Sequence, residues 1–394
     1  MKQNNFTEIA LIFLFVILIH SYVPTILEIL SNGANADFNW TPAKCVFKGI
    51  NHYSSYLMGD GKCYKDMSQY GEYAPGFYIL IYPYTLFDWT TAKILWAITN
   101  IILIFLTTYL LCKKFEVNKI FTLLILFFIF YSIITRVNLI MGQQTILMLF
   151  FLTLPFIYKS KWMIVFSGIS YFKYNIGYVL FLFYLVSKKY GKLLLSTIPY
   201  ILGLLIYCLI TSTNPIDNLF QPLQLLLKNS AVTGSFNNIF LFSFLKFFIH
   251  DTLSSYLVIL MITCFFNILV IAKITKVDDD LLKLSCLCLL ILVSLPHWGH
   301  DYILLIPLLV YSIKNYESNL FLFRVNFFVV IYFLQLYAAI QRYLNIILLK
   351  LNFEYIDFFN ISFPYFNIFI LFSLLIINLN FSKKNLSKKL QQTF

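Results

Sequence analysis

Residues 6–30 read FTEIALIFLFVILIHSYVPTILEIL, an apolar run that contains only two charged residues, Glu8 and Glu28. A helix needs roughly 20 mostly apolar residues to cross about 30 Å of hydrocarbon, so this run is long enough to span a bilayer. The apolar core of a signal peptide is shorter, about 7–15 residues. We therefore predict that this run is a permanent membrane anchor.

Similar apolar runs recur along the rest of the chain. Hydrophobic residues make up 60% of the sequence and charged residues 12%, and the mean hydropathy is +0.80. An average soluble domain is about half apolar and a quarter charged. Backbone groups inside a bilayer must pair within their own segment, which favours helices. The sequence therefore predicts an all-α polytopic transmembrane bundle, with residues 1–394 forming a single integral membrane domain.

The positions of the basic residues predict how the chain is threaded through the membrane. One arrangement places almost every sizeable Lys/Arg cluster on the cytoplasmic side, as the positive-inside rule requires. It has about 12 helices and both termini in the cytoplasm, including a basic tail at 382–394. The predicted crossings are 7–30, 93–112, 120–135, 143–158, 162–172, 175–187, 193–211, 252–272, 281–296, 301–314, 320–341 and 363–381. We assign the net charge of +12 to this orientation, so membrane lipids are expected partners and nucleic acid is not.

The predicted external side holds most of the polar chain. Two long loops lie there, 31–92 and 212–251, with a shorter loop and polar turns such as 136–142. Residues 75–87 are apolar but too short to span comfortably, so we predict a helix at the membrane interface within the first loop. Cys45 and Cys63 share this loop and can form a disulfide if it faces an oxidising compartment.

A basic residue interrupts the apolar stretch near its middle at Lys173, in the sequence FKYN. Basic loops of the cytoplasmic type flank this stretch on both ends. Two short helices that meet at Lys173 satisfy both flanks, whereas a single long crossing would place one basic cluster outside. We therefore predict a hairpin with Lys173 at its external end.

Three polar features are candidates for chemistry. Asp37 follows the first crossing closely, so its carboxylate can act as a general base on a hydroxyl at the membrane interface, or it can be an ordinary solvated residue or helix cap. Arg136 and Lys173 fall at predicted external helix ends, where a cation can grip a phosphate headgroup. Arg136 has the alternative of simply extending to the interface.

The densest polar cluster is residues 297–301, HWGHD. His297, His300 and Asp301 can hold a phosphate, bind the acceptor or ligate a metal, or they can form a polar turn with an interfacial Trp. No further ligand pair of similar spacing is visible, so we expect no metal. A phosphate-cradling Gly-rich loop is also absent, which argues against a soluble nucleotide substrate, and we expect no cofactor.

Four short motifs in this order resemble glycosyltransferase family 87, the polyprenol-phosphate-mannose-dependent mannosyltransferases of the GT-C class. They are Asp37 followed by residues 49–53 (GINHY), residues 73–75 (YAP), Gly142 and Gln143, and Lys173. The resemblance covers most of the first 190 residues. The chain departs from the family pattern at three positions, Ala74, Thr145 and Ile176, which leaves the sugar and the acceptor open.

The resemblance implies a hexosyltransferase of the plasma membrane with a GT-C-like fold and an external active site. It would transfer a hexose, with mannose the expected sugar, from a polyprenyl-phosphate-linked donor to a lipid or glycan acceptor, with inversion. The resemblance makes Asp37 the base and 31–92 the catalytic loop. The phosphate-binding residues would be Lys173, Arg136 and His300, and the substrate-binding residues Gln143, Tyr73 and His297.

Two other functional classes stay open at this point. A transporter or flippase for a lipid or polar solute also needs polar groups between helices, but it more often shows repeated halves and paired broken helices near the midplane. Here the polar residues collect on one predicted face, which favours the enzyme. A non-catalytic partner in a cell-envelope pathway is the third possibility.

Overall fold

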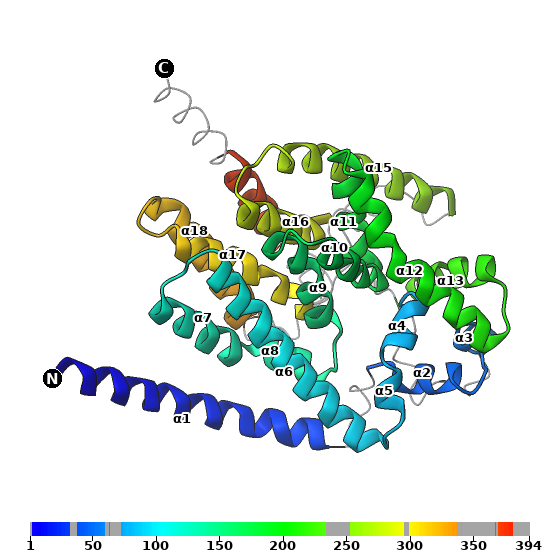
Figure 1. The fold of residues 1–394 in the computed structure, drawn as a ribbon, viewed down its shortest axis with the longest axis horizontal. Coiled ribbons are helices and arrows are strands. Elements are labelled where there is room, and N and C mark those ends of the chain that lie inside the picture. The colour runs from blue at the N-terminus through cyan, green and yellow to red at the C-terminus, as the bar shows by residue number, and fades with distance from the viewer. Residues whose placement is uncertain are drawn as a thin grey trace, which may run out of the picture.

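The computed structural model describes residues 2–31, 38–59, 63, 72–233, 253–294, 299–337, 340, 367 and 369–380. Every regular element in these ranges is a helix (Figure 1), so the all-α prediction is confirmed for this part of the chain. The first helix, α1 (Lys2–Leu30), covers the predicted anchor and lies along one edge of the molecule, where it contacts α6 and α8.

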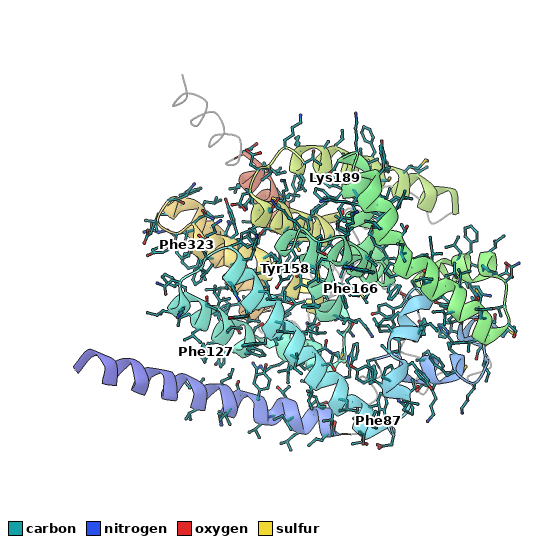
Figure 2. All side chains as sticks on the ribbon, in the orientation of Figure 1. Phe87, Phe127, Tyr158, Phe166, Lys189 and Phe323 are labelled. Atoms are coloured by element: carbon teal, nitrogen blue, oxygen red, sulfur yellow. A yellow bond between two sulfur atoms is a disulfide. The ribbon has the colours of Figure 1, made fainter. Side chains whose placement is uncertain are left out.

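Two helices in the described part of the chain are long and apolar enough to cross a membrane, α6 (Trp89–Lys114) and α12 (Tyr190–Thr211). Phe87 precedes α6 and Lys189 precedes α12, and these two residues lie on opposite sides of the molecule (Figure 2). The two helices thus start on opposite sides. The end of α6 carries Lys113 and Lys114, and the start of α12 carries Lys189 and Lys192. These basic ends fit the predicted cytoplasmic side. Shorter apolar helices occupy other predicted crossings, and the total of twelve stays a prediction.

A third span is formed only if α7 (Lys119–Tyr131) and α8 (Ile133–Ile140) are counted together, because they bend by 53°. The bend is at Ser132, whose hydroxyl accepts from the Thr135 N–H at 3.4 Å and donates to the Leu334 carbonyl at 3.0 Å. A side chain that caps a new helix start ends the previous one. The predicted turn at 136–142 was therefore wrong for its first residues, which continue α8.

Short helices occupy both predicted external loops. The first loop holds α2 (Trp40–Val46), α3 (His52–Met58), α4 (Pro75–Leu80) and α5 (Tyr82–Thr85), and the second begins with α13 (Pro215–Thr233). The single helix predicted over 75–87 is thus two helices, broken at Ile81. We call these five helices the cap layer. They gather around the start of α6 and the end of α12 (Figure 1).

The core lies beneath the cap layer. Its centre is α16 (Asp280–Ser294), in which every residue from Leu284 to Val293 is buried, as expected for a helix that is apolar on all sides. The helices that pack directly on it are α9 (Thr145–Ile157), α11 (Tyr174–Val186), α15 (Leu253–Ile274), η4 (Gly299–Leu305) and α17 (Ile306–Lys314). The core is extended by α10 (Lys161–Ser167) and η2 (Gly168–Phe172) beside α9, and by α18 (Leu320–Ile331) and the π-helical η5 (Tyr332–Leu336) beyond α17.

Within this core, the chain breaks between η2 and α11 at Lys173, as the sequence predicts. Lys173 has extended backbone angles, φ −108° and ψ 104°. The residue before it, Phe172, accepts a hydrogen bond at 3.0 Å from the N–H of Ala74 in the first loop. Its ring packs where two glycines meet, Gly76 of α4 and Gly203 of α12. This close crossing fixes the hairpin tip against the cap layer.

Enlarging Gly203 to Ala should destabilise the protein. The added Cβ would overlap the Cα of Gly76, and overpacking of a tight contact typically costs about 1–3 kcal/mol. We expect a lower unfolding temperature in detergent for Gly203→Ala. Gly191→Ala is the matched control on the same helix, because a Cβ there meets nothing within 4 Å. Equal unfolding temperatures for the two variants would contradict the close crossing.

The structure also answers the question that the sequence left open about the first loop. Cys45 and Cys63 are joined in a disulfide, with their Cα atoms 5.6 Å apart. The bridge ties α2 to the segment that follows α3.

Candidate active site

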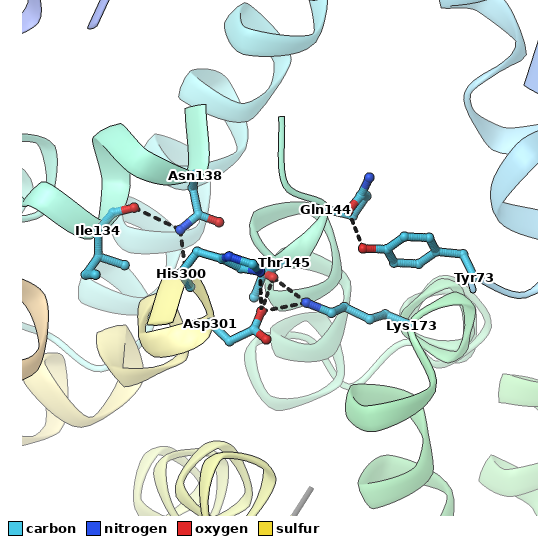
Figure 3. A network of polar contacts seen from close by, with 8 residues as sticks. All are labelled: Tyr73, Ile134, Asn138, Gln144, Thr145, Lys173, His300 and Asp301. Carbon is cyan, nitrogen blue, oxygen red and sulfur yellow. Dashed lines mark hydrogen bonds and ion pairs between the residues drawn. The ribbon is translucent and has the colours of Figure 1, made fainter. Parts of the chain in front are cut away.

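The centre of the candidate site is a buried ion pair. The ammonium Nζ of Lys173 lies 2.5 Å from Oδ1 of Asp301, and the two side chains are 11% and 2% exposed. Thr145 joins them, because its hydroxyl accepts from Lys173 at 2.7 Å and donates to Asp301. Figure 3 shows these three side chains meeting from three separate elements. Removing one partner of such a pair would leave an uncompensated buried charge.

The elements that carry the pair are positioned by hydrogen bonds to the backbone. Gly142, with φ of 60°, allows the chain to turn between α8 and α9, and the Gln143 N–H closes the turn on the Asn138 carbonyl at 2.9 Å. The Asn138 amide donates to the carbonyl of His300 at 2.7 Å, which holds η4 against α8. His300 Nε2 then lies 3.7 Å from the Asp301 carboxylate. Lys173 and His300, both predicted from the sequence, therefore flank the same carboxylate.

Tyr73 approaches from the cap layer. Its hydroxyl donates to the side-chain carbonyl of Gln144 at 2.5 Å, and its own backbone carbonyl accepts from the Tyr53 hydroxyl at 2.6 Å. Burial raises the pKa of Tyr73 well above its usual value, and the carboxylates of Asp301 and Glu72 act in the same direction. The hydroxyl therefore stays protonated and remains a hydrogen-bond donor. The sequence pointed to Gln143, whereas the residue bound to Tyr73 is its neighbour.

Two contacts show how deep the site lies below the cap layer. Trp96 is seven residues after the start of α6, or about 10 Å along its axis, and its indole donates to the Gly142 carbonyl at 3.0 Å. Gly203 is eight residues before the end of α12, or about 12 Å, and it meets Phe172. Gly142, which precedes Thr145, and Phe172, which precedes Lys173, are thus held at a similar distance from the ends of α6 and α12 that adjoin the cap layer.

Comparison with known proteins identifies the class. Residues 72–296 match glycosyltransferase family 87, which is more than half of the 394 residues. The chain belongs to glycosyltransferase family 87. No curated protein and no solved structure matches it. The match confirms the family resemblance drawn from the sequence motifs, and it makes the protein a membrane glycosyltransferase that uses a sugar donor and an acceptor.

The matched range of this family 87 glycosyltransferase includes Tyr73, Gln143 and Lys173. Asp37 precedes the range and also lies outside the described residues. The nearest described residues on its two sides are Ser31 and Phe38. The Ser31 carbonyl accepts from Lys93 at 2.5 Å, and the buried ring of Phe38 stacks on Trp96 with centroids 5.0 Å apart.

Two predicted site residues remain, Arg136 and His297. Arg136 lies in α8 and donates to the carbonyl of Ser21 in α1 at 3.3 Å, and this hydrogen bond links α8 to the first helix. His297 lies outside the described residues. Among the residues that are described, no three His, Cys, Asp or Glu side chains form a group suited to a metal ion.

Sequence reasoning for this glycosyltransferase missed the partners of Lys173. Asp301 was considered only as a member of the HWGHD cluster, and Thr145 only as a departure from a motif. One signal was available: a Lys within an apolar stretch needs an anion, and Asp301 is an acidic residue beside an apolar run. Gln144 and Asn138 carried no such signal, because neutral amides occur anywhere in a sequence.

Proposed function

We propose that this family 87 glycosyltransferase transfers a hexose, with mannose the first candidate, from a polyprenyl-phosphate-linked donor to an acceptor hydroxyl on the external face. The acceptor is a lipid or glycan, and the transfer inverts the anomeric configuration. The observation that carries the proposal is the depth of Lys173, a buried cation about 10 Å inside the outer ends of the long apolar helices. A phosphate at that depth is most simply carried there by a lipid.

The local electrostatics support an anion next to Lys173. Lys173 is the N-cap of α11, and a helix N-terminus favours negative charge through the peptide dipoles. The ammonium is already paired with Asp301. A phosphate would be a second anionic partner, in contact with Lys173 and His300. The Lys173 ammonium and an N–H of the His300 ring would then stabilise the phosphate as its charge develops on leaving.

The chemistry requires one further group, and we assign it to Asp37. The acceptor oxygen would form a bond to the anomeric carbon while the bond from that carbon to the phosphate oxygen breaks. The phosphate leaves with the bonding electrons, and the acceptor proton passes to the Asp37 carboxylate. The anchoring supports this assignment, because Phe38 is bonded to Asp37 and stacks on Trp96, which also binds the turn before Thr145.

The remaining assignments follow the same proposal. Residues 31–92 form the external catalytic loop, and Gln143 and Tyr73 shape the substrate pocket together with His297. Arg136 assists in binding the donor phosphate, and its hydrogen bond to Ser21 places the first helix. The Cys45–Cys63 disulfide supports an oxidising, external compartment for this loop. Both termini and the tail 382–394 are then cytoplasmic, and the membrane is the plasma membrane.

A direct transfer assay tests the proposal. Membranes that contain the protein should move radiolabel from a polyprenyl-phosphate hexose to an acceptor and release polyprenyl phosphate, whereas membranes without the protein should not. Mannose, glucose and galactose donors are compared in parallel, and the anomeric configuration of the product is read by NMR. Transfer from a nucleotide sugar after polyprenyl-phosphate sugars have been depleted would overturn the proposed donor. Retained configuration would overturn inversion.

A further inference from the structure

Helix α13 has an unusual distribution of side chains. At about 100° per residue, Ile216, Leu219 and Phe220 fall in one sector, and they are 64%, 42% and 52% exposed. Asn218, by contrast, is fully buried on the opposite side. A helix on the surface of a water-soluble domain buries its apolar sector and exposes its polar one. This helix exposes an apolar sector and buries Asn218 together with Leu225.

The inward polar residues of α13 bind the first loop. The amide of Asn51 on α3 donates to Asn218 at 2.9 Å and to Gln221 at 3.0 Å. Gln221 in turn donates to the hydroxyl of Ser54 at 3.1 Å. Asn51 also caps α3, since its side chain accepts from the Tyr53 N–H at 3.0 Å. The polar sector is therefore used to hold α3.

The exposed apolar sector continues the exposed apolar surface of α12. Helix α12 meets the requirements for a membrane span, and its side chains stay exposed close to its end, where Leu209 is 80% exposed. Residues 212–214 alone separate α12 from α13. Beside the apolar sector of α13 lies a polar flank, in which Asp217 and Gln224 are exposed. An apolar sector bordered by a polar flank suits the boundary between acyl chains and water.

We propose that α13 lies along the membrane surface, with Ile216, Leu219 and Phe220 in the acyl chains of the leaflet where α12 ends. Asp217 and Gln224 face the water. Through Asn218 and Gln221 the helix ties α3, and with it the first loop, to the bilayer. This role is separate from sugar transfer.

Spin labels on one helix test this orientation. Nitroxides are attached at Phe220→Cys and Leu219→Cys, with Asp217→Cys as the matched control, in the full-length protein in lipid nanodiscs. Signal from the five native free cysteines is subtracted by labelling the unsubstituted protein. Collisions with oxygen, which concentrates in acyl chains, are compared with collisions with a water-soluble nickel chelate.

The expected result is an oxygen-to-nickel collision ratio several-fold higher at 219 and 220 than at 217. Equal ratios at 217 and 220 would show that the sector faces water and would overturn the proposal. A label at 220 that is immobilised and reached by neither reagent would also overturn it, because the sector would then be covered by protein. The same measurement on Asp37→Asn should give the same ratios, whether or not that variant transfers sugar.

Discussion

Replacing Asp37 by Asn should abolish sugar transfer and leave insertion and folding unchanged. The amide keeps the size of the side chain but cannot take the acceptor proton. Loss of a general base typically reduces the rate by about 10²- to 10⁴-fold. We expect the transfer of radiolabel from the polyprenyl-phosphate donor to fall by this factor, with an unchanged unfolding temperature in detergent.

A second carboxylate of the same loop provides the control. Asp60→Asn changes the charge of the loop equally but should retain most of the activity. An Asp37→Asn variant that transfers sugar at the rate of the unsubstituted protein would remove Asp37 from the mechanism. Equal losses in both variants would indicate a general effect of loop charge and would contradict a specific base.

Breaking the Lys173–Asp301 pair should have the largest effect on stability. Each partner is almost fully buried, and removing one member of a buried pair typically costs about 3–5 kcal/mol, because the other charge is left uncompensated. We therefore expect Lys173→Met and Asp301→Asn each to lower the unfolding temperature in detergent substantially. We also expect Lys173→Met to lose sugar transfer, because the leaving phosphate loses its cation.

The double variant separates the two roles of the pair. Lys173→Met combined with Asp301→Asn leaves no unpaired charge, so it should recover much of the stability that either single variant loses. It should not recover sugar transfer, because Lys173 is still missing. A double variant that is stable and active would show that Lys173 only balances Asp301. Additive losses of stability would contradict direct coupling of the two side chains.

The sequence predicted a large part of the fold. The all-helical class, the apolar runs and the helix break at Lys173 all appear in the described residues. Errors arose where a side chain capped a new helix within an apolar run, as Ser132 does for α8. The second external loop was likewise predicted without α13, because polar residues and Pro222 interrupt its apolar ones and leave no long apolar run.

The site was predicted less completely than the fold. Lys173 and His300 both lie beside the Asp301 carboxylate, Tyr73 binds Gln144, and Arg136 binds the first helix. The carboxylate that Lys173 meets is 128 residues away in the chain. Nothing local in the sequence relates two residues at that separation.

The sequence by itself determined that this family 87 glycosyltransferase is a helical membrane protein, because apolar length and backbone hydrogen bonding are local properties. It also determined that a cation interrupts an apolar stretch at Lys173. Only the tertiary structure decided that Asp301 pairs with Lys173, how deep this pair lies, and which side of α13 is buried. These features depend on packing between elements that are distant in the sequence. A buried charge is tolerated only where packing brings a partner to it, and a short motif does not contain that partner.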